Sequence, residues 1–104
     1  MDIKLSKAYA TKVGQSVDEN HLFGLIESEL NTRGIARDAY RLGADPHMGF
    51  GELRLTRDGG YWVVCTEERG EAFNPCVFAN YFDAVNYFLF ELTGTGGGDL
   101  WAKL

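Results

Sequence analysis

The stretch from residue 52 to residue 78 constrains the fold most, because polar and apolar side chains alternate along much of it. A period of two is typical of β-strands that bury one face. Asp58-Gly59-Gly60 and Arg69-Gly70-Glu71 interrupt the alternation, and glycine and aspartate tolerate the positive φ that tight hairpin turns require. The pattern predicts three antiparallel strands, at 52–57, 61–66 and 72–78.

Pro75 lies inside the third predicted strand. Proline has no backbone N–H to donate to a neighbouring strand. We therefore expect this strand to lie at an edge of the sheet, or to be bulged at the proline.

A helix is predicted before the strands, at about 17–33. Ser16 and Glu19 have the spacing of a capping box, and Gly34 suits the left-handed position that follows a helix. Apolar residues between them recur at helical spacing and form one stripe: Leu22, Phe23, Ile26 and Leu30.

A second helix is predicted after the strands. Asn80 and Asp83 form an N-terminal cap pair, and Gly94 ends the helix. Its core stripe is Tyr81, Ala84, Val85, Phe88 and Leu92, widened by Phe82, Leu89 and Phe90.

The remaining segments give weaker signals. Residues 4–9 fit either a short strand or a turn, and 34–50 are expected to be irregular, with a short extended piece at Tyr40-Arg41-Leu42. The glycine-rich residues 93–98 are expected to be a flexible joint to a tail at 99–104, which Trp101 and Leu104 can dock. We expect one domain, 1–104, with its core at about 17–93.

The predicted fold is α+β in the order α-β-β-β-α, a three-stranded antiparallel sheet with two helices packed on one face. The two turns place six apolar side chains on the helix face: Leu53, Leu55, Trp62, Val64, Phe73 and Val77. The opposite face is expected to be open and mixed, with Glu52, Arg54, Thr56, Tyr61, Val63, Cys65, Glu67, Asn74, Cys76 and Phe78. An open sheet face is a natural place for function.

The chain has 15 acidic and 10 basic residues, for a net charge of -5. This balance disfavours binding to a phosphate backbone and favours a basic partner. The opening MDIKLSK has no apolar signal region, and no apolar run reaches the length of a membrane span. We expect a soluble cytoplasmic protein with reduced thiols and no membrane partner.

Catalytic and metal motifs are weak. Cys65 and Cys76 fit no zinc spacing, and nothing ties His21 or His47 to Cys65 as a base. Glu67 and Glu68 are adjacent on a strand, so they point to opposite faces and cannot share a proton. We expect a binding protein without metal or cofactor. A non-toxin adaptor or enzyme accessory domain and a small thiol-dependent enzyme at Cys65 remain the alternatives.

A series of short motifs spans residues 17–92: Tyr40-Arg41-Leu42-Gly43, Trp62-Val63-Val64, Glu68-Arg69-Gly70, and then Phe78, Ala84 and Phe88-Leu89. This pattern resembles small immunity proteins of bacterial polymorphic-toxin and contact-dependent growth inhibition systems. The resemblance implies a non-enzymatic inhibitor that binds a cognate toxin domain, in many cases a basic nuclease, and blocks its active site or substrate surface.

Partner contacts are expected on the open sheet face and the hairpin tips. The candidate residues are Glu52, Arg54, Asp58, Tyr61, Glu67, Glu68, Arg69 and Glu71. Glu27 and Glu29 on the first helix form a second candidate surface.

Overall fold

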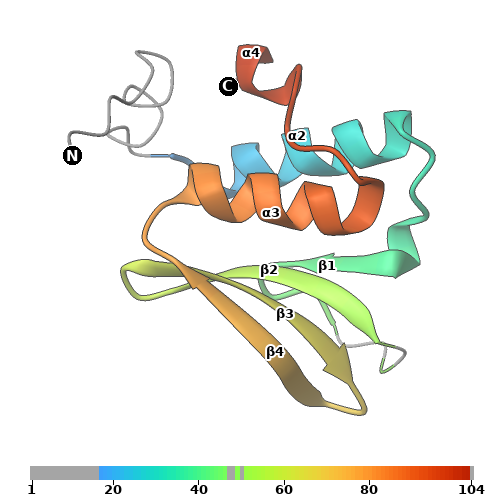
Figure 1. Cartoon of the computed structure of the whole chain (residues 1–104), viewed down its shortest axis with the longest axis vertical. Helices are drawn as coiled ribbons and strands as arrows, with labels where there is room; N and C mark the ends of the chain where they lie inside the picture. The colour runs from blue at the N-terminus through green and yellow to red at the C-terminus, as the bar shows by residue number, and fades with distance from the viewer. Residues whose placement is uncertain (1–16, 47–48, 50, 104) are drawn as a thin grey trace.

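A computed structural model describes residues 17–46, 49 and 51–103 of the chain (Figure 1). The expectations for residues 4–9, Ser16, His47 and Leu104 lie outside these described residues. The elements, in order, are α2 (Glu19–Thr32), the short 3₁₀ helix η1 (Arg37–Ala39), β1 (Tyr40–Leu42), β2 (Glu52–Asp58), β3 (Tyr61–Glu68), β4 (Glu71–Phe78), α3 (Tyr81–Thr93) and α4 (Leu100–Lys103). This confirms the α+β class.

The sheet has four strands in the order β1-β2-β3-β4, so the prediction of three strands was wrong. The extra strand is the short extended piece Tyr40–Leu42, which pairs with β2 in parallel, while the other pairs are antiparallel. All three residues of β1 are buried, so the strand has no alternation of polar and apolar positions. That absence of a period made β1 hard to recognise in the sequence.

The expected irregularity at Pro75 is present, and β4 lies at an edge of the sheet. Val64 faces Cys76 and Thr66 faces Phe73, so two residues of β4, Asn74 and Pro75, stand opposite one residue of β3. Asn74 has a φ of 52°, a left-handed conformation that asparagine tolerates. This is a β-bulge, which adds one residue to one strand of a pair.

The bulge moves the following side chains of β4 to the other face of the sheet. Phe78 faces Trp62 and Cys76 faces Val64, on the helix side, while Val77 faces Val63 on the outer side and is 61% exposed. The predicted faces of Val77, Cys76 and Phe78 were therefore wrong, because they assumed an unbulged register. The same shift separates Cys65 from Cys76, which lie on opposite faces as free thiols.

Helix α2 buries its predicted stripe of Leu22, Ile26 and Leu30. Its N-cap is Asp18, whose carboxylate accepts hydrogen bonds from the backbone N–H groups of Asn20 and His21, so the helix begins slightly later than predicted. Helix α3 is capped as predicted, because the Asn80 side chain accepts a 2.8 Å hydrogen bond from the N–H of Asp83.

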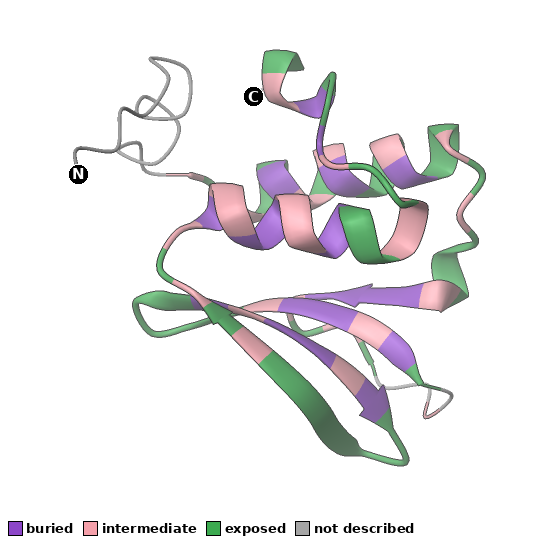
Figure 2. Ribbon diagram, viewed as in Figure 1, coloured by how far each residue is buried: buried purple, intermediate pink, exposed green. Residues whose placement is uncertain are grey.

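Both long helices lie on one face of the sheet, as expected (Figure 1). The buried residues gather between the helices and the sheet, whereas β4 is mostly exposed (Figure 2). The core includes Leu55, Trp62 and Val64 from the sheet and Phe88 and Leu89 from α3. None of the helices in the part of the chain that the structure describes is long and apolar enough to cross a membrane.

The glycine-rich segment after α3 is held in place by side chains, contrary to the expected flexible joint. Arg33 donates hydrogen bonds to the hydroxyls of Thr93 and Thr95 and to the carbonyl of Gly96, at 2.9–3.0 Å. A side chain at Gly97 would collide with Trp101, because an added Cβ would lie 2.3 Å from its indole nitrogen.

Helix α4 docks on the body of the protein through its two large apolar residues. Leu100 is 1% exposed, and the ring of Trp101 stacks on Phe82 with 4.5 Å between centroids. The Asn86 side chain accepts hydrogen bonds from the backbone N–H of Gly97 and from the Trp101 indole. The tail therefore belongs to the folded core.

Candidate functional site

The outer face of the sheet is buried around Glu52, Arg54 and Glu67, contrary to the expected open face. Glu52, Arg54 and Glu67 are between 3% and 6% exposed. Arg54 forms an ion pair with Glu67 and donates hydrogen bonds to the carbonyls of Gly43 and Asp45. Gly43 and Asp45, which follow β1, therefore lie against this face.

Arg41 is a fourth buried charged residue beside Glu52, Arg54 and Glu67, and its own buried Nε has no hydrogen-bond partner among the described residues. Arg41 stands beside Arg54 in the parallel register and donates hydrogen bonds to the carbonyls of Arg37 and Tyr40. Two arginines and two carboxylates balance each other, so the net charge of -5 is carried by the rest of the chain. Buried charges of this kind specify one arrangement of buried groups more than they add stability.

Cys65 lies on the same outer face and is buried. Burial and the negative charge of Glu67 raise the pKa of its thiol, against the opposing effect of Arg54. A nucleophilic cysteine needs the opposite, an accessible thiolate with a lowered pKa. This environment weighs against the thiol-enzyme alternative.

The five other predicted contact residues are exposed, but they form two separate patches. Asp58 and Tyr61 lie at the β2–β3 turn, whereas Glu68, Arg69 and Glu71 lie at the β3–β4 turn. The 8 residues of β3 separate the two turns by about 25 Å at the usual rise of a strand. The structure therefore does not bring the predicted residues together into one site.

The β3–β4 turn forms a hairpin tip, defined as Glu68, Arg69, Glu71 and Phe73. These four residues line a hollow of about 370 Å³. Glu68 and Glu71 are directly opposite in the register, and like charges in that position are destabilising. Arg69 has a φ of 54°, which costs a non-glycine residue roughly 1–2 kcal/mol. Local costs of this kind are often retained at functional sites.

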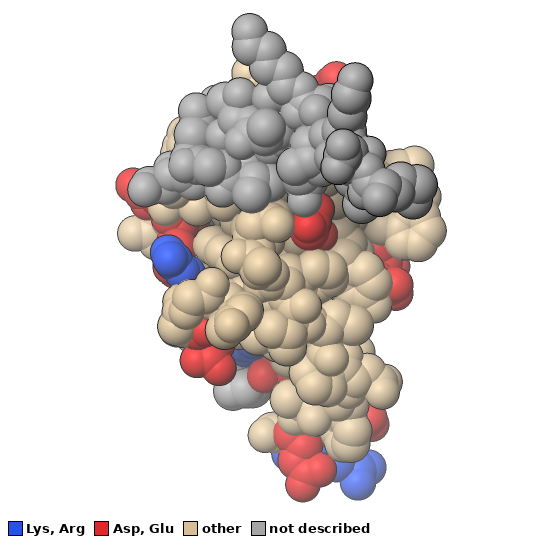
Figure 3. Space-filling view, turned by 60° about the vertical axis from the view of Figure 1, so that its left-hand side comes forward, with Lys and Arg blue, Asp and Glu red and all other residues tan. Residues whose placement is uncertain are grey.

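Next to the hairpin tip lies an uncharged surface that wraps around the edge strand, which we call the edge face. It is defined as Phe73, Cys76 and Phe78 of β4 with Tyr87 of α3 on the helix side, and Val77 of β4 on the outer side. Residues 72–82 contain no charged side chain. Figure 3 shows this broad uncharged surface, with charges gathered below it at the tip. Phe73 is 43% exposed, although it faces the helix side, because the hairpin extends beyond the helices (Figure 1).

Tyr87 covers the helix side of β4 within this face. Its ring lies 5.4 Å from that of Phe78, and its hydroxyl accepts a 3.5 Å hydrogen bond from Cys76. The interaction with Cys76 and partial burial raise the pKa of Tyr87 to about 12, so the hydroxyl stays neutral at physiological pH. The sequence analysis placed Phe73 and Val77 in the core. Pro75 signalled the irregularity that turns Val77 outward, whereas Phe73 precedes the bulge, keeps its predicted side and is exposed because the hairpin extends beyond the helices.

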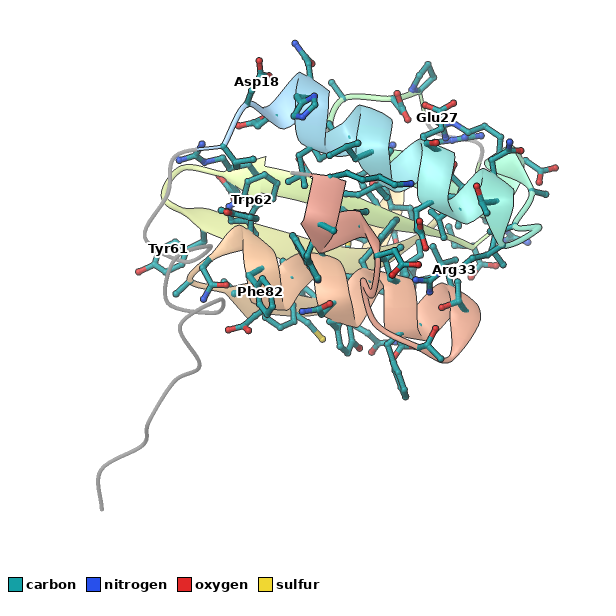
Figure 4. The ribbon with its side chains drawn as sticks, turned by 90° about the horizontal axis from the view of Figure 1, so that it is seen from above. Asp18, Glu27, Arg33, Tyr61, Trp62 and Phe82 are labelled. Atoms are coloured by element: carbon teal, nitrogen blue, oxygen red, sulfur yellow. The ribbon has the colours of Figure 1, made fainter. Side chains whose placement is uncertain are left out.

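The second predicted surface, on α2, separates into two environments. Glu29 forms a 2.9 Å ion pair with Arg33 beside the tail, whereas Glu27 lies on the side of α2 that faces away from α3 (Figure 4). Two hollows of about 340 and 590 Å³ meet there and share Gly24, Glu27 and Arg37. We call the two hollows together the α2 groove.

Among the described residues, no three His, Cys, Asp or Glu side chains are grouped to hold a metal ion. Comparisons with protein-family models, curated proteins and solved structures find no match for this chain.

Proposed function

We propose that this protein is an inhibitor of the immunity type, which binds a basic toxin domain, of the nuclease kind, and neutralises it by occluding its active site or substrate surface. The observation that supports this proposal most is the edge face, an exposed uncharged surface with apolar side chains that ends at the acidic hairpin tip. An apolar centre beside a charged rim is the usual composition of a specific protein interface.

Phe73 and Val77 are the anchors in this mechanism, since few, mostly large apolar or aromatic side chains supply most of the energy of an interface. Glu68 and Glu71 flank them and face cations of the partner that would otherwise bind phosphates. Complementary charge accelerates encounter and sets orientation more than it adds affinity. The repulsion between the two glutamates is relieved once a cation lies between them.

The proposal predicts that a toxin domain is encoded beside this protein. The test uses that domain, with affinity measured by calorimetry and nuclease activity measured with and without the inhibitor. Phe73→Ala is expected to cost about 2 kcal/mol of binding, or roughly thirty-fold in Kd. The double reversal Glu68→Lys with Glu71→Lys is expected to slow association and to reduce its dependence on salt.

Asp99→Lys is a matched control, because Asp99 is exposed in the tail, away from the hairpin. Thermal melting of each variant verifies that the fold is intact. Glu67 is left unchanged, since it is buried and its reversal would disrupt the fold. The proposal fails if the wild-type protein neither binds the toxin domain nor reduces its activity.

A further inference from the structure

The α2 groove is built from one side of α2 and the segment that follows β1. Glu19, Phe23 and Glu27 recur every four residues, so they lie on one side of the helix. Leu42, Gly43 and Asp45 form the other wall. The hollows have the size of ordinary ligand pockets.

Gly24 opens this groove, and nothing else in the described structure requires a glycine there. It lies in the interior of α2, where glycine weakens a helix relative to alanine. An added Cβ would meet no atom within 4 Å, and the backbone does not adopt a positive φ at this position. A longer side chain here would instead take up space beside Glu27, where both hollows are lined by Gly24.

The groove already holds one guanidinium group. Arg37 lies over the ring of Tyr40, with 4.7 Å from its Cζ to the ring centroid. It also forms ion pairs with Asp45 and, at 3.4 Å, with Glu27. These contacts show which chemistry suits the groove: a planar cation against an aromatic ring, held by carboxylates.

The groove retains an excess of negative charge after this pairing. Its lining carries three carboxylates, Glu19, Glu27 and Asp45, against the single cation Arg37. Glu19 has a further, solvent-exposed contact with Arg57 at 3.5 Å. Charge complementarity therefore favours a cationic occupant over a neutral or acidic one.

We propose that the α2 groove receives an arginine or lysine side chain of the protein partner, with its cation between Glu19 and Glu27 and its apolar stem over Phe23 in the space left by Gly24. The inference rests on the proposed function, which makes the partner basic. It adds a second contact, separate from the edge face, and so predicts that the partner presents cations at two places.

The first test compares Gly24→Leu, which fills the groove, with Gly24→Ala. Both variants remove a helix-weakening glycine, so we expect a melting temperature equal to or above that of the wild type. Gly24→Leu is nevertheless expected to weaken binding of the toxin domain at least tenfold, and Gly24→Ala less. Equal affinity of Gly24→Leu and the wild type would overturn the inference.

A matched charge pair sharpens this test. Glu27→Gln removes one carboxylate from the groove, whereas Asp38→Asn removes one from an exposed position outside its lining. We expect Glu27→Gln to weaken binding of the toxin domain several-fold, and Asp38→Asn to leave the affinity unchanged. Equal losses for both would show that net charge alone matters, and would overturn the groove as a site.

A second measurement needs no partner. N-acetyl-arginine amide is titrated into the protein, and backbone amide shifts are followed by NMR, with neutral N-acetyl-norleucine amide as the control probe. We expect saturable shifts at Gly24 and Gly43 with the arginine probe alone, abolished by Gly24→Leu. Shifts that do not saturate, or that survive Gly24→Leu, would overturn the inference.

The two proposals fail in distinguishable ways. Saturable arginine binding without any binding of the toxin domain supports the groove and removes the proposed function. Toxin binding that depends on Phe73 but not on Gly24 or Glu27 supports the function and removes the groove from the interface.

Discussion

Replacing Arg33 by methionine should detach the C-terminal tail from the body of the protein. Methionine keeps most of the side-chain volume but removes every donor. Arg33 makes charge-assisted hydrogen bonds of 2.9–3.0 Å to Thr93, Thr95 and Gly96, and its side chain is 20% exposed. Such bonds contribute roughly 1.5 kcal/mol each at the low end of their range. Because the site is partly solvated, we count only two of the three hydrogen bonds, and the free energy of unfolding should therefore fall by about 3 kcal/mol.

This loss would be large against the roughly 5–15 kcal/mol that stabilises a domain. Urea unfolding followed by tryptophan fluorescence measures it, because Trp101 lies in the tail and Trp62 in the core. Amide exchange at Gly97, whose N–H is bound by Asn86, should accelerate in the same variant.

Arg57→Met is the control, since Arg57 is more exposed and makes only weak contacts, a 3.5 Å ion pair with Glu19 and a guanidinium 5.7 Å from the centroid of the Trp62 ring. Exposed ion pairs contribute under about 1 kcal/mol. The reasoning would be refuted if both variants lost the same stability, or if Arg33→Met left exchange at Gly97 unchanged.

Three further predictions address the site and its surroundings. Arg69→Asn should raise the free energy of unfolding in urea by about 1 kcal/mol, because asparagine tolerates the left-handed conformation at the β3–β4 turn. The same variant should weaken partner binding, and a loss of stability would contradict the assignment of strain. Glu67→Gln should lower the free energy of unfolding by about 3 kcal/mol, because it leaves the buried guanidinium of Arg54 without its charge partner. Glu68→Gln, at an exposed position, should lower it by under about 0.5 kcal/mol. Equal losses in calorimetric melting would exclude a buried ion pair. Burial is the largest single effect on the pKa of Asp45 and raises it, but the hydrogen bonds from Arg37 and the Leu42 N–H and the charges of Arg37 and Arg41 together outweigh burial and lower that pKa below the ordinary 3.8. The carboxylate should therefore stabilise the fold above pH 3.8 and lose this contribution as the pH falls through the lowered value. The stability gap between wild type and Asp45→Asn should therefore close in acid, and a gap independent of pH would refute the pairing.

The helices could be predicted closely because their signals are local. Asn80 caps α3, Gly94 ends it in a left-handed conformation, and the stripe of Leu22, Ile26 and Leu30 is buried. Each of these depends on residues within one or two turns of helix. The same holds for the turn at Arg69-Gly70, where both residues have positive φ.

The sheet was harder to predict because its faces depend on distant pairings. One inserted residue at Asn74-Pro75 reversed the faces of Cys76, Val77 and Phe78. Pro75 predicted an irregularity in this strand, but it did not predict which side chains the irregularity would move to the other face.

The candidate site was the least predictable part. Glu52, Arg54 and Glu67 have the polar character of surface residues, and the contacts of Arg54 with Gly43 and Asp45 depend on tertiary structure that no local pattern predicts. Gly24 carried no sequence signal of a groove, because a glycine within a helix is recognised as functional only once its empty surroundings are seen.

The bulge in β4 also has a consequence for solubility. An edge strand with exposed Phe73 and Val77 could be expected to recruit strands from other molecules and aggregate. Pro75 offers no N–H, and the left-handed Asn74 breaks the regular spacing of backbone groups beside it. The apolar side chains thus remain available to a partner while the backbone at the centre of the edge resists continuous pairing with another strand. A protein built this way can keep an apolar binding surface exposed without polymerising through it.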